Sequence, residues 1–262
     1  MKRPSQPSRR GAAGLMLAVL MALAPSLMHA QQKEIHVAAA ADLQPAMPAL
    51  AAAYEHATGV KVITSFGSSA TLSQQLSNGD PQDLFLSADF IHPEHLVAAG
   101  LADDKAPIPY ARGVLVLWAR KDSPAQPLSL DSMTKPAVQK IAIANDLHAP
   151  YGVAGKQALR AMRLLDTLTP KLVVAENVMQ GAQFAESGNA QAAIISQTIA
   201  DSPHFRELGT FVLFPTVYAP INQCGIVMKS AKNAAGAHDF LRWLTSKDIQ
   251  ENLKKYGLDP VQ

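Results

Sequence analysis

Short apolar runs alternate with helical patterns along most of the chain, and this alternation constrains the fold more than any other feature. The runs EIHVAAAA (34–41), KVITSF (61–66) and DLFLSA (83–88) have the length and composition of buried strands. Each is followed by a segment with apolar residues at helical spacing, as in LQPAMPALAAAYEHATG (43–59) after the first run. This pattern predicts an α/β protein with mostly parallel strands.

A second series of strands and helices starts near residue 113. GVLVLWARK (113–121) is typical of a long buried strand, and KIAIAN, LVVAE and AAIIS are shorter strands separated by helical segments. The chain closes with NAAGAHDFLRWLTSKDIQENLKKYG (233–257), which we expect to form one long amphipathic helix. Two α/β units facing each other would enclose a cleft at the carboxyl ends of their strands.

The first 30 residues are typical of a secretory signal peptide. A basic start precedes a short apolar run, and MHA has the form of a cleavage site between Ala30 and Gln31. The alternative is an uncleaved membrane anchor, although the apolar run is short for a membrane span. We therefore expect residues 1–30 to be removed and the protein to be periplasmic.

Removing the signal peptide reverses the charge balance. The formal net charge of the whole chain is +2, and the first 30 residues hold four basic residues and no acidic ones, so the remainder carries −2. No basic surface is left to suggest a nucleic-acid partner. Cys224 is the only cysteine, which excludes an internal disulfide and a lipid attached near the cleavage site. We expect a monomer with no direct membrane anchor.

Four junctions between a strand and a helix share one chemistry. They are AAADLQ with Asp42, FGSSAT with Ser68 and Ser69, APYGVAG with Tyr151, and AENVMQG with Val178. Each can present unpaired backbone N–H groups at a helix amino terminus, where the helix dipole favours an anion. None of the four contains lysine or arginine, so an anion held there would be bound by neutral donors. For any single junction taken alone, helix capping is the better explanation.

At these same residues the sequence resembles the periplasmic molybdate-binding proteins of ABC import systems. Four blocks carry the resemblance in order: VAAAADLQPAM, SFGSSATLSQQLSNGDPQDLFLSAD, ANDLHAPYGVAGKQAL and DTLTPKLVVAENVMQG. The resemblance implies a two-lobed periplasmic-binding-protein fold, type II-like, with the ligand in the interlobe cleft. We expect the first lobe to comprise 33–110 plus 226–262 and the second to comprise 111–225.

The resemblance also implies which residues hold the oxyanion: Asp42, Ser69, Tyr151 and Val178, with Ser68 and Ser196 as further candidates. Relatives often have serine or asparagine at Asp42, so we expect its carboxylate to turn outward as a helix cap while its N–H faces the ligand. The alternative is that Asp42 accepts a proton from an anion such as hydrogen phosphate. Some relatives use a tyrosine hydroxyl where this chain has Ser196, and the Tyr151 hydroxyl could compensate.

The function implied is that of a receptor which binds molybdate and tungstate and delivers them to a membrane ABC permease. Molybdenum would enter only as molybdate, with no other metal or cofactor. One alternative is a receptor for another oxyanion, such as phosphate or sulfate. A periplasmic hydrolase is the third hypothesis, although the chain lacks a GxSxG motif and no motif joins Ser, His and Asp into a triad. We expect no enzymatic activity.

Overall fold

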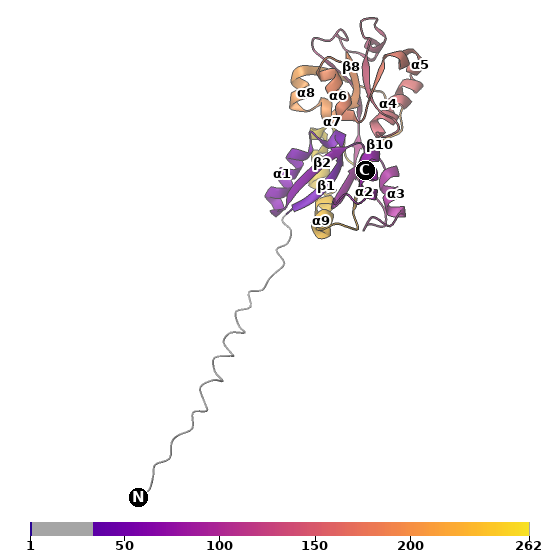
Figure 1. Ribbon diagram of the computed structural model, residues 1–262. Coiled ribbons are helices and arrows are strands. Elements are labelled where there is room, and N and C mark those ends of the chain that lie inside the picture. The colour runs from indigo at the N-terminus through magenta and orange to yellow at the C-terminus, as the bar shows by residue number, and fades with distance from the viewer. Residues whose placement is uncertain (2–33, 262) are drawn as a thin grey trace. The chain divides into compact units, whose positions relative to one another are not determined.

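The computed structural model describes Met1 and residues 34–261, so the expected signal peptide lies outside the described residues. Residues 34–261 contain two separate β-sheets, each with its own helices (Figure 1). Among the described residues, no helix combines the length and the apolar character needed to cross a membrane.

The first sheet has six strands in the order β11-β4-β10-β3-β1-β2. Strand β1 pairs in parallel with β2 and β3, whereas β10 is antiparallel to β3 and β4. The strands are β1 (Glu34–Ala40), β2 (Lys61–Gly67), β3 (Leu84–Ser87), β4 (Ile108–Gly113), β10 (Ile221–Val227) and β11 (Leu258–Asp259). Four small or apolar residues at the end of β1 are fully buried, as expected for an inner strand of a covered sheet.

The second sheet has five strands in the order β7-β6-β8-β5-β9. Strand β6 is parallel to β7 and β8, and β5 is antiparallel to β8 and β9. The strands are β5 (Leu115–Arg120), β6 (Ile141–Ala144), β7 (Leu172–Ala175), β8 (Ala192–Ser196) and β9 (Gly209–Leu213). Trp118 on β5 is fully buried, and its indole N–H donates to the Phe205 carbonyl over 3.2 Å.

Helices pack on both sheets, and the chain end returns to the first one. In Figure 1 the C-terminal α9 lies with the N-terminal strands, and α9 contacts β1. The helices with the first sheet are η1 (Ala41–Leu43), α1 (Met47–Thr58), α2 (Ser69–Ser77), α3 (Ile91–Ala98), α9 (Ala234–Leu244), α10 (Lys247–Asn252) and η4 (Leu253–Tyr256). Those of the second part are η2 (Leu130–Thr134), α4 (Pro150–Ala161), α5 (Leu165–Leu168), η3 (Thr169–Lys171), α6 (Val178–Glu186), α7 (Gln197–Ala200) and α8 (Pro203–Leu208).

The chain crosses between the sheets twice, from β4 to β5 and from β9 to β10. We call residues 34–113 with 221–261 the first lobe and residues 114–220 the second lobe. The sequence-based boundaries placed 111–113 and 221–225 in the second lobe. In the structure 111–113 pair with 221–223, and 224–225 pair with 108–109, all within the first sheet. The position of this crossing could not be read from the apolar run that begins at Gly113, because only Val114 separates β4 from β5.

The expectation of one long C-terminal helix is wrong. Helix α9 ends at Leu244, and α10 starts at Lys247 after Ser246, whose backbone is extended at ψ 151°. Thr245 and Ser246 interrupt the pattern because short hydroxyl side chains favour helix ends over helix interiors. A 3-10 turn over Leu253–Tyr256 then leads to Gly257, whose φ of 72° ends the segment.

Candidate functional site

A small cavity lies between the lobes, at the carboxyl end of β1 and the amino ends of α2, α4 and α6. Its volume is about 10 Å³, which leaves room for about one water-sized group. The lining residues come from both lobes and are Ala40, Ala41, Asp42, Gly67, Ser68, Ser69, Ala88, Ala149, Pro150, Tyr151, Asn177 and Val178. Five of the six predicted site residues are therefore brought together here, and no described lysine or arginine lines the cavity.

The first turn of α2 leaves one amide free to face a ligand. Ser68 caps the helix, because its hydroxyl accepts from the Thr71 N–H and donates to Thr71 Oγ1. The Ala70 N–H donates to the His148 carbonyl of the second lobe over 3.1 Å. The Ser69 N–H has no partner among the described residues. The Ser69 hydroxyl accepts from the Ala88 N–H over 3.1 Å, which leaves its own proton available to the cavity.

Helices α4 and α6 each add an unpaired N–H group from the second lobe. Pro150 is the first residue of α4 and has no N–H group. The Gly152 and Val153 N–H groups both donate to the Ala149 carbonyl, whereas the Tyr151 N–H has no hydrogen-bond partner among the described residues. Asn177 caps α6 through the Gln180 N–H, and the Val178 N–H at the first helical position has no described partner. Both tyrosine and valine thus contribute backbone rather than side-chain donors.

These groups make a site of positive potential without a cation. Three long helices direct their amino ends at one cavity, and the dipole of each places partial positive charge there. The free N–H groups of Ser69, Tyr151 and Val178 and the hydroxyl of Ser69 are all donors. Such a set is complementary to an anion with several acceptor oxygens.

Asp42 does not turn outward, contrary to the sequence-based expectation. Its side chain is fully buried and makes no helix-capping bond. Oδ2 accepts from Gln223 Nε2 over 2.6 Å and from the Tyr151 hydroxyl over 3.1 Å, whereas Oδ1 is buried with no hydrogen-bond partner. Desolvation by burial raises the pKa of Asp42 to about 6, although hydrogen bonds from Gln223 and Tyr151 lower it in part.

Gln223 and Tyr110 are the residues that sequence reasoning missed. The Tyr110 hydroxyl donates to Gln223 Oε1 over 2.8 Å, and this contact directs the amide nitrogen of Gln223 toward Asp42. Gln223 is fully buried in β10, within the apolar run INQCGIV. A polar amide in a strand that is otherwise expected to be buried could have identified Gln223 as a functional candidate, since buried polar groups need a defined hydrogen-bond partner.

Ser196 does not line the cavity. Its hydroxyl caps α7 and bonds to the Thr198 hydroxyl over 2.6 Å. The Tyr151 hydroxyl does not replace it, because that group is bonded to Asp42. Ser196 is therefore outside the set of residues that the structure brings together.

Two further hydrogen bonds join the lobes beside the cavity. One is the Ala70 to His148 backbone bond, and the other runs from Thr71 Oγ1 to Glu176 Oε1 over 2.9 Å. Thr71 and Glu176 lie one or two residues from cavity-lining positions on α2 and α6. Direct hydrogen bonds beside the cavity thus hold the two lobes together.

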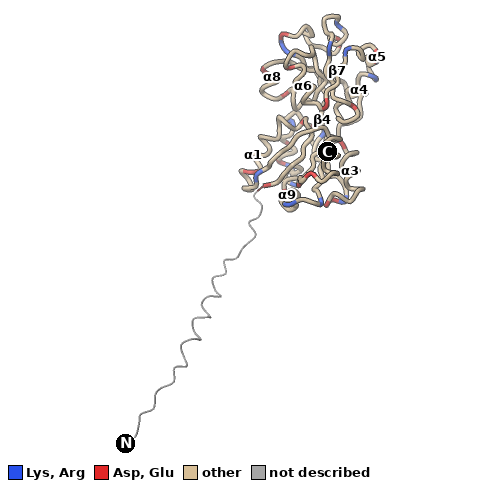
Figure 2. The backbone as a smooth tube through the Cα atoms, in the orientation of Figure 1, with Lys and Arg blue, Asp and Glu red and all other residues tan. Residues whose placement is uncertain are grey.

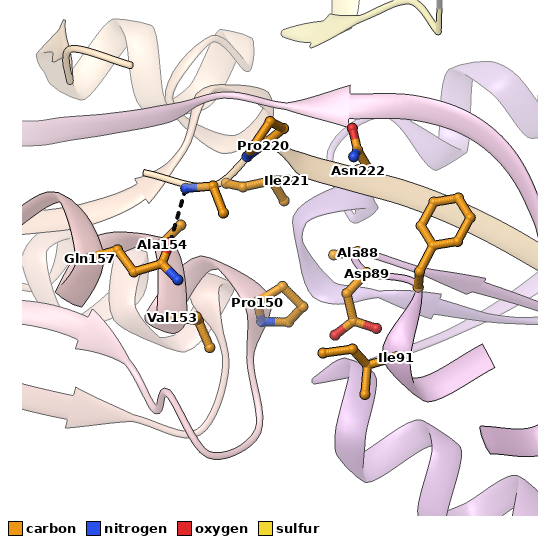
Figure 3. A pocket seen from close by; sticks show the side chains of 12 residues that line it. Ala88, Asp89, Ile91, Pro150, Val153, Ala154, Gln157, Pro220, Ile221 and Asn222 are labelled. Atoms are coloured by element: carbon orange, nitrogen blue, oxygen red, sulfur yellow. Dashed lines mark hydrogen bonds between the residues drawn. The ribbon is translucent and has the colours of Figure 1, made fainter. Parts of the chain in front are cut away.

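A larger pocket of about 300 Å³ adjoins the cavity and shares Ala88 and Pro150 with it. Figure 3 shows Pro150 on one side and Asp89 with Ile91 on the other. Its charged group is the carboxylate of Asp89, which pairs with His92 Nδ1 over 2.7 Å. An acidic, mostly apolar pocket does not suit an anion. No group of three or more metal-ligating side chains occurs among the described residues.

The charged residues of the described chain do not gather in one place in the view of Figure 2. Lys and Arg are spread along the tube, with Asp and Glu among them. The small cavity between the lobes is therefore the site on which a function can be built.

Comparisons with known proteins show the family of the chain. The family model for bacterial extracellular solute-binding proteins matches residues 35–259. The molybdate-binding protein ModA of Rhodobacter capsulatus is 32% identical over 255 residues, which are 96% of this chain and 96% of that protein. ModA of Azotobacter vinelandii is 34% identical over 87% of this chain and 90% of its own length.

Solved structures give the same result for the fold. The periplasmic molybdate-binding protein of Azotobacter vinelandii superposes with a TM-score of 0.79 at 31% identity, covering 87% of this chain and all of that one. These matches confirm the expected fold class and the expected resemblance.

Proposed function

Because the chain belongs to the bacterial extracellular solute-binding protein family, we propose that it is a receptor that binds molybdate. It captures the anion outside the cytoplasmic membrane and delivers it to a membrane ABC permease. Tungstate, which has the same charge and shape, is bound as well. The convergence of the Ser69, Tyr151 and Val178 N–H groups on one cavity is the observation that carries this proposal.

The hydrogen bonds from the neutral donors are of the size needed for micromolar binding of an anion. Hydrogen bonds to a charged group contribute about 1.5–3 kcal/mol each. The three N–H groups and the Ser69 hydroxyl therefore provide about 6–12 kcal/mol, whereas a micromolar Kd needs about 8 kcal/mol net. A fifth donor would raise this range to about 7.5–15 kcal/mol, most of which lies above that threshold.

The lobes supply selectivity through closure. The donors that face the cavity come from both lobes, so an anion completes its hydrogen bonds only when the lobes are together. Sulfate is smaller than molybdate, so its oxygens would lie too far from some of the donors once the lobes have closed around a molybdate-sized space. The permease would recognise the closed arrangement.

A thermal-shift panel of molybdate, tungstate, sulfate and phosphate on the protein lacking residues 1–30 tests the function. Molybdate at 100 times its Kd stabilises the folded state by about 2.7 kcal/mol, and we expect this shift with molybdate and tungstate alone. A shift with phosphate alone would instead support a receptor for a protonated anion that donates to Asp42. Turnover of an ester substrate would contradict the proposal.

A further inference from the structure

The two oxygens of the Asp42 carboxyl group have different surroundings. Oδ2 accepts two hydrogen bonds, from Gln223 and Tyr151, whereas Oδ1 accepts none although it is buried. A buried polar atom without a partner is costly, so its environment calls for an explanation. Asp42 also lines the cavity between the lobes.

The neighbours of Asp42 decide where a proton can sit. Tyr110 donates to Gln223 Oε1, which presents the Gln223 amide N–H to Oδ2. The Tyr151 hydroxyl occupies the same oxygen. The Gln223 amide requires Oδ2 to be an acceptor, and the Tyr151 hydroxyl donates to the same oxygen, so we place a proton on this carboxyl group at Oδ1.

An ionised Oδ1 conflicts with the rest of the cavity. Ser69, Tyr151 and Val178 line the same cavity as Asp42, and the groups they offer to an anion are donors. A carboxylate beside a bound dianion would repel it in a medium of low dielectric constant. A protonated Oδ1 would instead add one more donor to the set.

We propose that Asp42 binds the oxyanion as a neutral carboxylic acid, donating the proton on Oδ1 to an anion oxygen, so that each captured dianion takes up one proton. The inference rests on the proposed function. The proton comes from a buffer acid in the solvent and stays on Asp42, and no covalent bond to the anion forms.

Among the titratable groups around Asp42, only Asp42 itself is expected to change its protonation state near neutral pH. Tyr110 from β4 and Tyr151 from α4 face it, and burial, together with the charge of Asp42, raises the pKa of both well above 10. Gln223 from β10 does not titrate, and no described histidine, lysine or arginine lines the cavity. Burial places the pKa of Asp42 itself at about 6.

Isothermal titration calorimetry with molybdate at pH 6, 7 and 8, in two buffers of different ionisation enthalpy, tests the inference. For the wild-type protein we expect affinity to fall about tenfold from pH 7 to pH 8, with uptake of about one proton per anion at pH 8. Asp42→Asn keeps an acceptor for Gln223 and Tyr151 and places a permanent N–H donor at the position of Oδ1. Its affinity should not change over this range and should exceed that of the wild type at pH 8 by at least tenfold.

Asp89→Asn is the matched control, because it removes a nearby carboxylate that does not line the cavity. It should keep the wild-type pH dependence. Wild-type binding without pH dependence or proton uptake overturns the inference and leaves the proposed function standing. Persistence of the pH dependence in Asp42→Asn also overturns it, since the proton would then belong to another group. Failure of the wild type to bind molybdate at every pH overturns both.

Discussion

The hydroxyl of Tyr151 in the second lobe donates a hydrogen bond to Oδ2 of Asp42 in the first lobe, over 3.1 Å. The same tyrosine directs its backbone N–H at the cavity between the lobes, so one residue both joins the lobes and faces the proposed ligand. Closure and anion binding are therefore expected to depend on the same few contacts, and variants at these positions separate the two effects.

Ser69→Ala removes the one side-chain hydroxyl with a proton free to enter the cavity. We expect molybdate binding to weaken by about 1–3 kcal/mol, because a hydrogen bond to a charged group is lost. Calorimetric titration measures this change. Ser77→Ala, at the other end of α2, removes a hydroxyl that bonds only to the Ser73 carbonyl and should leave affinity unchanged. Equal affinities for the wild type and Ser69→Ala would contradict the site assignment.

Asp42→Asn should make the folded protein more stable at neutral pH. The pKa of Asp42 is raised from 3.8 to about 6 in the folded state. The folded state therefore holds this proton more tightly, and the stability conferred is fully present below pH 3.8 and lost as the pH rises through 6. The amide has no charge to bury, so its advantage should reach about 3 kcal/mol above pH 6. Chemical unfolding at pH 4 and pH 7.5 measures it, and an equal difference at both values would refute the assignment.

Gly152→Ala should destabilise the protein and weaken molybdate binding. A Cβ at Gly152 would lie 2.3 Å from the Ala144 carbonyl oxygen, so the start of α4 must shift away from β6. Such overpacking typically costs about 1–3 kcal/mol, and the shift moves the Tyr151 N–H. Denaturant unfolding and titration measure the two effects.

Gly181→Ala on α6 is the matched control for that variant. A Cβ there makes only an ordinary contact, 3.7 Å from the Ala175 Cβ. Alanine should stabilise this helix by about 0.5–1 kcal/mol. If Gly152→Ala behaves like Gly181→Ala, the close packing of α4 on β6 is not what positions Tyr151.

Glu176→Ala removes the side-chain bond from Thr71 that joins the lobes without lining the cavity. We expect the molybdate dissociation rate to rise by up to about tenfold, because an exposed hydrogen bond contributes about 0.5–1.5 kcal/mol. Stopped-flow measurement gives the rate. Glu186→Ala, at the other end of α6, removes a carboxylate paired with His204 and should leave the rate unchanged. A wild-type rate in Glu176→Ala would show that this contact does not hold the lobes together.

The sequence predicted the α/β class and the two series of strands because their apolar periods are strong and local. It also predicted that Asp42, Ser69, Tyr151 and Val178 lie together. Helix starts that follow parallel strands lie at the carboxyl edge of each sheet, and the resemblance implies that two such edges face each other. The orientation of the Asp42 side chain could not be predicted from the sequence. That orientation depends on Gln223, which lies 181 residues away along the chain. A local sequence pattern cannot indicate a contact between residues so far apart in the chain.

The errors at element ends have local causes. The expected lobe boundary after residue 110 differs from the boundary between the sheets, because β4 and β5 are nearly continuous. Ser196 was named from resemblance, but its hydroxyl caps α7 by accepting from the Ile199 N–H and also bonds to the Thr198 hydroxyl. The SQT sequence at that position is itself a signal for capping.

A crystal structure with molybdate, phased on the anomalous signal of molybdenum, would show whether uncharged donors hold the doubly negative ion. We expect one molybdenum peak between the lobes, with anion oxygens within hydrogen-bond distance of the Ser69, Tyr151 and Val178 N–H groups and of Asp42 Oδ1. A lysine or arginine bonded to the anion, or a peak in the larger pocket beside Asp89, would contradict this expectation.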